Sequence, residues 1–309
     1  MKYDIIGDIH GYAQSLKALI TKLGYRLADG SYSHPEHDRQ AVFLGDFIDR
    51  GPEIQETLGI VRPMVEKGNA VSVMGNHEYN AICFDTESPH KVNEWLRSHN
   101  SRHIYQHIET LYQFKKNRDA WQSHLEWFWT LPLYLDLDGI RVVHASWDSW
   151  SFEVFRPYST TGASLTKRLL EQSADEGTIE FSAIQNALKG IEVDLPDSVR
   201  IVDKDGFSRK ETRVKWWEPA QGKSMKDLIF PYRETTAESP IPDDDAARIP
   251  GYDNKKPVFF GHYWLKSDKP SALTPFVACL DYSVAGNGIL AAYSWNGEQE
   301  LVDEHFSWV

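Results

Sequence analysis

Short apolar runs recur along the chain, and each ends in a polar turn that is usually marked by glycine. Runs of this length, rich in β-branched and aromatic residues, are typical of buried β-strands. In open α/β sheets, ligands bind at the edge where strands end, and a polar residue stands just past each of these runs. The pattern therefore predicts candidate ligands at one sheet edge. The runs are Tyr3–Ile6, Ala41–Leu44, Ala70–Met74, Ile140–Val143 and Pro257–Phe260.

Helical periodicity separates the first three runs. Residues 16–23 carry Leu or Ile at i, i+3, i+4 and i+7, and Gly24 supplies a stop signal. Apolar residues also repeat every three or four positions over 54–65. This order of strand, helix, strand, helix and strand predicts a parallel core with right-handed crossovers. Residues 90–130 are also expected to be helical.

The remaining part of the chain divides into two patterns. Near the C-terminus, Phe276–Tyr282, Gly288–Trp295 and Glu300–His305 predict a β-meander. Between residues 149 and 255, two expected helices, Ser164–Gln172 and Phe181–Leu188, precede a long polar tract rich in Pro and Asp. Such a tract is too long for an ordinary connection. We expect one domain over residues 1–309, with residues 149–255 as an insertion or lid.

The residues at the strand ends have the chemistry of metal ligands. Carboxylate oxygen, imidazole nitrogen and amide oxygen suit Mn²⁺, Fe or Zn²⁺. The set is too large for one tetrahedral site and fits two adjacent ions that share a carboxylate, an arrangement that serves phosphoryl transfer. We expect the other histidines, such as His99, His103 and His107, to be solvated surface residues. The strand-end set is Asp8, His10, Asp46, Asp49, Arg50, Asn76, His77, His144 and His262.

Three ordered motifs make this set specific. They are Gly-Asp-x-His-Gly over 7–11, Gly-Asp-x-x-Asp-Arg-Gly over 45–51, and Gly-Asn-His-Glu over 75–78. With the later His144 and His262, they resemble the calcineurin-like metallophosphoesterases, and most closely the phosphoprotein-phosphatase branch with its bacterial and phage enzymes. The resemblance covers residues 1–148 and 257–295. It implies a four-layer α/β/β/α sandwich of two mixed β-sheets with flanking helices.

The resemblance also implies roles for the strand-end residues. One metal ion would take Asp8, His10 and Asp46, and the other would take Asp46, Asn76, His144 and His262. Arg50 and Asn76 would bind the substrate phosphate, and His77, oriented by Asp49, would protonate the leaving oxygen. Two divalent ions, expected to be Mn²⁺ with Fe or Zn²⁺ as alternatives, would bind a bridging water that loses its proton near neutral pH. Glu78 is expected to start a helix or to support a ligand.

Two positions depart from the family pattern. Asp281-Tyr282-Ser283 stands where the family usually has Asp-Thr-Gly, and the second phosphate-binding arginine has no obvious counterpart. Arg213 is a candidate for that second arginine. Tryptophans 147, 150, 216, 217 and 264 lie in the insertion or near the last two histidines, where they could stack a nucleobase or pack the insertion onto the core.

Composition narrows the class of protein. The net charge of −12 disfavours general nucleic-acid binding. No apolar stretch approaches the ~20 residues of a membrane span, and no signal peptide is recognisable. The two cysteines, Cys83 and Cys279, suggest no disulfide framework. These features predict a cytoplasmic protein.

Three functions remain open from the sequence. The first is hydrolysis of phosphomonoesters, including phosphoserine and phosphothreonine. The second is a nucleotidase of the symmetrical dinucleoside-tetraphosphatase type. The third, a catalytically inactive binding protein, is disfavoured because every expected ligand is present. The expected partner is a phosphorylated protein or nucleotide.

Overall fold

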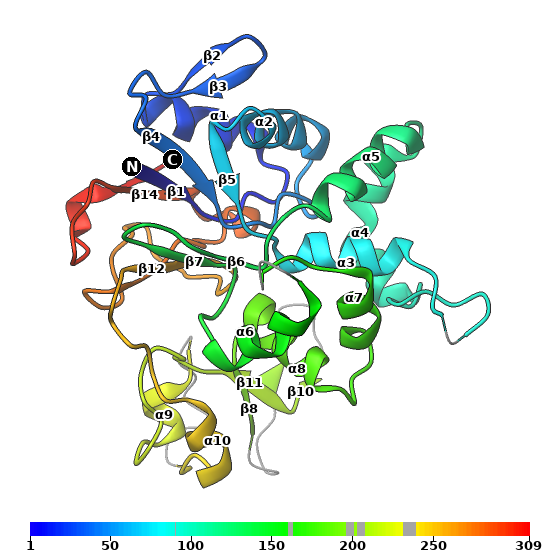
Figure 1. The fold of residues 1–309 in the computed structure, drawn as a ribbon, viewed down its shortest axis with the longest axis vertical. Coiled ribbons are helices and arrows are strands. Elements are labelled where there is room, and N and C mark those ends of the chain that lie inside the picture. The colour runs from blue at the N-terminus through cyan, green and yellow to red at the C-terminus, as the bar shows by residue number, and fades with distance from the viewer. Residues whose placement is uncertain (90, 160–162, 196–200, 203–207, 231–238) are drawn as a thin grey trace.

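Two mixed β-sheets form the centre of the computed structural model, which describes residues 1–89, 91–159, 163–195, 201–202, 208–230 and 239–309 (Figure 1). The larger sheet has the order β15-β14-β1-β4-β5, and the smaller has the order β13-β12-β7-β6. The larger sheet contains β1 (Lys2–Ile6), β4 (Arg39–Phe43), β5 (Ala70–Ser72), β14 (Ala291–Trp295) and β15 (Phe306–Trp308). The smaller contains β6 (Tyr134–Asp136), β7 (Arg141–Val143), β12 (Val258–Phe260) and β13 (Val277–Cys279).

The strand directions confirm the predicted parallel core. Strand β4 pairs in parallel with both β1 and β5, and helices connect these strands along the chain. In the smaller sheet, β12 is parallel to both β7 and β13. Strands β14 and β6 are antiparallel to their neighbours β1 and β7, so both sheets are mixed, as expected.

Successive side chains of each strand point to opposite faces of the sheet, and this alternation produces the layers. Ile6 and Phe43 face the cluster that contains Leu16 of α1 (Ala13–Lys22) and Leu58 of α2 (Ile54–Glu66). Their neighbours Ile5 and Val42 face Val142 and Phe259 of the smaller sheet. Because successive strand residues point to opposite faces, each sheet has one face on the inter-sheet core and one on an outer layer. Three further helices, α3 (Asn76–Asp85), α4 (Ser101–Phe114) and α5 (Arg118–Phe128), lie beside the larger sheet's end (Figure 1).

The outer face of the smaller sheet is covered by the region after residue 149. Phe260 packs there with Val214, Trp216 and Trp217 in one buried cluster. Trp216 and Trp217 therefore have a packing role, and the alternative that they stack a nucleobase is wrong for these two. The elements of this region are α6 (Ser149–Phe155), η1 (Arg156–Tyr158), α7 (Lys167–Ser173), α8 (Ile179–Lys189), β8 (Glu192–Asp194), β9 (Ile201–Val202), β10 (Ser208–Arg209), β11 (Glu211–Arg213), α9 (Met225–Leu228) and α10 (Asp243–Arg248).

The predicted C-terminal β-meander is wrong. Strand β13 joins the smaller sheet beside β12, whereas β14 joins the larger sheet beside β1. Residues 300–305 form no strand and include the 3-10 turn η4 (Asp303–His305); the strand β15 follows them. The turn after β13, which includes η3 (Val284–Gly286), carries the chain from one sheet to the other. Turn residues show where the chain reverses but do not determine its next partner.

A small hairpin went unpredicted. Strands β2 (Arg26–Ala28) and β3 (Ser31–Ser33) pair across Asp29 and Gly30, which have φ of 50° and 75°. Asp-Gly is a common sequence of two-residue hairpin turns, so this signal was present but short. Among the described residues, no helix combines the length and apolar character that crossing a bilayer requires.

Candidate metal centre

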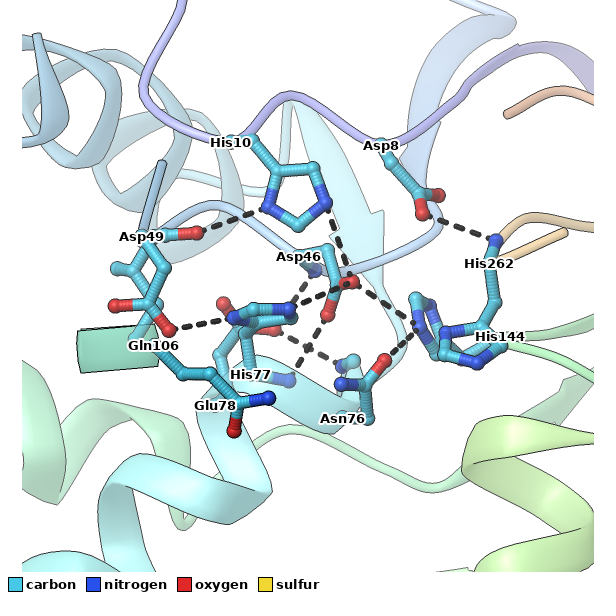
Figure 2. A network of polar contacts seen from close by, with 12 residues as sticks. Asp8, His10, Asp46, Asp49, Asn76, His77, Glu78, Gln106, His144 and His262 are labelled. Carbon is cyan, nitrogen blue, oxygen red and sulfur yellow. Dashed lines mark hydrogen bonds and ion pairs between the residues drawn. The ribbon is translucent and has the colours of Figure 1, made fainter. Parts of the chain in front are cut away.

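Residues from five strand ends meet at one place. Asp8, Asp46, Asn76, His144 and His262 follow β1, β4, β5, β7 and β12 respectively, as predicted. Figure 2 shows their side chains gathered around Asp46, with His10 and His77 completing the ring. The sequence therefore identified the members of this cluster, and the fold brings them together from both sheets.

Asp46 lies at the centre of two possible ligand groups. His10, Asp46 and His77 form one, and Asp46, His144 and His262 form the other, each with its potential ligand atoms within 4.8 Å of one another. Asp46 Oδ2 lies 3.5 Å from His10 Nε2 and 3.4 Å from His144 Nε2. A carboxylate shared in this way suits the bridging position between two ions.

Backbone carbonyls orient two of the histidines. His10 Nδ1 lies 3.0 Å from the Ile48 carbonyl oxygen, and His144 Nδ1 lies 2.7 Å from that of Leu44. A carbonyl can only accept, so Nδ1 donates and Nε2 is left facing Asp46, where the neutral form of the ring could offer its lone pair to a metal ion. This is the usual support of a metal-binding histidine.

Two buried polar atoms of this cluster have no hydrogen-bond partner among the described residues. They are Asp8 Oδ1 and His10 Nε2. Asp8 lies outside both ligand groups of Asp46, and its Oδ2 accepts from the His262 backbone N–H at 2.9 Å. Unsatisfied buried polar atoms are costly, and a cation between them would remove that cost. The donor set of this cluster therefore fits metal ions.

Burial and neighbouring charges strongly shift the pKa values of the cluster. Burial and the nearby carboxylates of Asp281 and Asp46 raise the pKa of Asp8 well above its usual value. Burial lowers the pKa of His10 to about 3. Burial opposes the charge of His144 as well, but the adjacent Asp46 carboxylate raises its pKa to about 10. Burial also opposes the charge of Asp46, but His144 and His77 outweigh it and hold its pKa well below the usual range.

Asn76 and Glu78 connect the cluster to α3. Asn76 Oδ1 lies 3.0 Å from His144 Nε2. The Glu78 carboxylate accepts from the backbone N–H groups of Asp46, Phe47 and Gly75 at 2.8–3.0 Å. Glu78 thus joins the ends of β4 and β5 and lies in the first turn of α3, which agrees with both expected roles.

Backbone strain is concentrated at this cluster. A positive φ is unfavourable for residues other than glycine and is common at functional sites. An ideal Cβ on Gly75 would lie 2.2 Å from Asp46 Oδ1, so close approach requires glycine there. The residues of the cluster with φ between 48° and 70° are His10, Asp46, Asp49, Arg50, His262 and Trp264.

Asp49 is held by more groups than the motifs indicate. Its Oδ2 lies 2.5 Å from His77 Nδ1, as predicted. Its Oδ1 accepts from Thr110 Oγ1 at 2.5 Å and lies 2.7 Å from His107 Nδ1. Burial opposes ionisation of Asp49, but His107 and His77 hold its pKa below its usual value.

The prediction of a surface role for His107 is therefore wrong. His107 is buried beside Asp49 and approaches it from α4. The available signal was the spacing of His107 and Thr110, which places both on one helix face.

Arg50 extends outward from the cluster over Trp264. Its Cζ lies 4.5 Å from the ring centroid of Trp264, and its side chain is exposed. The Trp264 backbone N–H donates to Asp281 Oδ2 at 2.8 Å, and the Ser283 N–H donates to Oδ1 at 2.9 Å. Asp281 thus fixes the loop that carries Trp264, although the usual Thr-Gly is absent.

Trp264 is expected to position Arg50 for phosphate binding. Replacing Trp264 with Leu should lower kcat/KM for p-nitrophenyl phosphate about 2- to 30-fold, because a cation–π contact contributes roughly 0.5–2 kcal/mol. Trp264→Phe should retain more activity. Trp308→Leu is the matched control, since Trp308 holds Lys22 at 5.6 Å outside this site. An equal loss in the control would contradict the positioning role.

Arg213 reaches the cluster at His262. Its Nη1 donates to the His262 carbonyl oxygen at 3.0 Å, and its guanidinium lies 5.3 Å from the Tyr263 ring centroid. Burial, followed by the charge of Arg213, lowers the pKa of His262 well below its usual value. Strand β11 therefore brings a cation from the region 149–255 to a candidate ligand.

A family model described as calcineurin-like phosphoesterase matches residues 1–263. The chain belongs to the calcineurin-like phosphoesterase family. Membership makes it a hydrolase that acts on phosphoester bonds, and the family is metal-dependent. The resemblance and the two-sheet fold predicted from the motifs are thus confirmed.

Among curated relatives in this family, the chain is similar to two proteins named asymmetrical bis(5'-nucleosyl)-tetraphosphatase PrpE. The one from Oceanobacillus iheyensis is 34% identical over 145 residues, which cover 47% of this chain and 55% of that protein. The one from Bacillus velezensis is 49% identical over 98 residues, which cover 32% of this chain and 39% of that protein. The chain therefore matches about half the length, or less, of these relatives.

The fold is also similar to that of a solved phosphatase. A cold-active protein tyrosine phosphatase aligns with a TM-score of 0.50 at 15% identity, covering 94% of this chain and 73% of that chain. This likeness concerns the fold of the phosphoesterase alone.

Proposed function

We propose that this phosphoesterase hydrolyses nucleotides, with dinucleoside polyphosphates as its main substrate class. The observation that carries the proposed chemistry is the meeting of two ligand groups at Asp46, next to the His77–Asp49 pair. The nucleotide class is supported by the names of the similar relatives. Those names specify the asymmetrical reaction, whereas the metal motifs alone left the symmetrical type open.

The residues present fit two divalent ions. We propose that Asp8, His10 and Asp46 hold one ion, and that Asp46, Asn76, His144 and His262 hold the other, with Mn²⁺ as the expected metal. When bound, such a pair activates water and neutralises charge on the phosphoryl group. His77 shares a possible ligand group with His10 and Asp46, but we assign its Nδ1 to Asp49 and its Nε2 to catalysis.

The protein's own groups carry the remaining steps. Arg50 and Asn76 bind oxygens of the scissile phosphoryl group, and Arg213 contributes positive charge near His262. As the bond from phosphorus to the leaving oxygen breaks, His77 Nε2 gives that oxygen a proton. Asp49 holds the Nδ1–H of His77 and stabilises the positive ring before the transfer.

Hydrolysis of phosphoserine and phosphothreonine is the second candidate. The Arg50 side chain is exposed at the outer side of the site, so a phosphate carried on a protein could reach it. One panel of nucleotide and phosphopeptide substrates can compare both classes.

A substrate panel tests the proposed function. The full chain is treated with a chelator, reloaded with Mn²⁺ and assayed on diadenosine tetraphosphate, a phosphopeptide, p-nitrophenyl phosphate and a cyclic nucleotide. We expect activity only after reloading, with the highest kcat/KM on the dinucleotide. Chromatography of the products distinguishes AMP with ATP from two ADP. Activity that survives complete metal removal would contradict the metal centre, and activity on the phosphopeptide alone would contradict the nucleotide class.

A further inference from the structure

Arg97 is fixed in the segment between α3 and α4. Its Nη1 donates to Asn80 Oδ1 at 3.1 Å, and its Nη2 donates to Gln106 Oε1 at 2.8 Å. Its backbone N–H also donates to the Cys83 carbonyl oxygen at 3.0 Å. Both the main chain and the guanidinium are therefore held in place, and the side chain is partly buried.

The two side chains that hold Arg97 lie near the pair formed by His77 and Asp49. Asn80 lies one helical turn after His77 in α3, so the two residues share a helix face. Gln106 comes from α4, and Figure 2 shows it beside His77 and Asp49. Arg97 therefore lies on the His77 side of the site, where the leaving group departs in the proposed reaction.

The Arg97 guanidinium has neutral partners. Both acceptors are amide oxygens, and among the described residues no carboxylate oxygen forms an ion pair with Arg97. Asp49 is close enough to interact through its charge, but its oxygens are already engaged by His77, His107 and Thr110. A desolvated guanidinium without a carboxylate partner is well suited to bind a phosphate.

Two other cations lie in the same region as Arg97. Burial is the main cause of the lowered pKa of His103, and the positive charges of Arg97, Arg102 and Lys189 lower it further. Three cations thus act on one side chain in a chain whose net charge is −12. A local basic region on an acidic protein favours a specific anionic ligand.

We propose that Arg97 binds a phosphate of the leaving group, so that the site prefers substrates in which the scissile phosphoryl group is joined to a further phosphate. The inference rests on the proposed function and specifies its substrate class as phosphoanhydrides. In the reaction, water oxygen forms the new bond to phosphorus and the bridging oxygen departs with the proton of His77. The charge of the released phosphate chain is then neutralised by Arg97.

The test compares a phosphoanhydride with a substrate whose leaving group carries no phosphate. Arg97→Met is expected to lower kcat/KM for diadenosine tetraphosphate about 10- to 100-fold, the range for losing a hydrogen bond to a charged group. Its kcat/KM for p-nitrophenyl phosphate should stay within about twofold, and Arg97→Lys should recover part of the loss on the dinucleotide. Arg26→Met, on the exposed hairpin strand β2, is the charge-matched control and should leave both values unchanged.

Equal losses on both substrates in Arg97→Met would assign Arg97 a structural role and overturn the inference. Binding of the methylene analogue of tripolyphosphate, whose P–C–P bridges cannot be hydrolysed, decides the point without turnover when measured by calorimetry on Mn²⁺-loaded protein. We expect Arg97→Met and Arg97→Lys to weaken this binding while leaving inorganic phosphate binding unchanged, and unchanged binding of the analogue in both variants would also overturn it. Absence of hydrolysis on every substrate would reject the proposed function, whereas the calorimetric result would still decide the role of Arg97.

Discussion

Replacing Asp46 with Asn is expected to remove at least one metal ion and to lower kcat on every phosphoester by more than about 100-fold. Loss of a residue that merely supports a metal ligand commonly costs 10- to 100-fold, and Asp46 is assigned as a ligand shared by both ions. Asn is nearly the same size and can still accept the His77 backbone N–H, which Asp46 Oδ1 accepts at 3.0 Å. The substitution therefore removes charge with little change in shape.

Metal content and activity are to be measured together for Asp46→Asn, by elemental analysis and by steady-state assay on p-nitrophenyl phosphate. Asp136→Asn is the matched control, because Asp136 is an exposed partner of Lys256 and Arg141. The control should keep both ions and full activity. If Asp46→Asn also kept its metal and activity, the assignment of Asp46 as a bridge would be wrong.

The ligand cluster could be predicted because its residues lie next to strands that are evident in the sequence. A buried strand followed by Gly-Asp or Gly-Asn places the polar side chain at the sheet edge, whatever the rest of the chain does. His144 and His262 likewise stand just past the ends of strands β7 and β12 of the second sheet. The parallel core was predictable for a similar reason, since the helices between β1, β4 and β5 require crossovers.

Residues that reach the cluster from elsewhere were not predictable in this way. His107 and Thr110 contact Asp49 across about sixty positions of sequence, through the packing of α4 against the loop after β4. The contact between Arg50 and Trp264 connects the loop after β4 of the larger sheet with the loop after β12 of the smaller sheet. The β-meander prediction failed for the same reason. The chain changes sheets between β13 and β14, and local turn chemistry contains no information about the partner strand.

Replacing His77 with Ala is expected to produce a loss that depends on the leaving group. General acid catalysis contributes about 10²- to 10⁴-fold when the leaving oxygen needs a proton. An alkyl phosphate such as phosphoserine needs that proton, whereas p-nitrophenol barely does. His77→Ala should therefore reduce kcat far more on the alkyl phosphate than on p-nitrophenyl phosphate. Rates for a series of substituted phenyl phosphates give the dependence directly.

Two comparisons separate the acid role of His77 from other roles. Because His77 also lies in a possible ligand group with His10 and Asp46, the metal content of His77→Ala must equal that of the natural chain. Loss of an ion would make His77 a ligand instead. His107→Ala leaves His77 in place but removes one partner of Asp49, so it should cause a smaller loss with the same leaving-group trend. Equal losses of His77→Ala on all leaving groups would exclude proton donation, since a proton donor must matter most where the leaving oxygen is most basic.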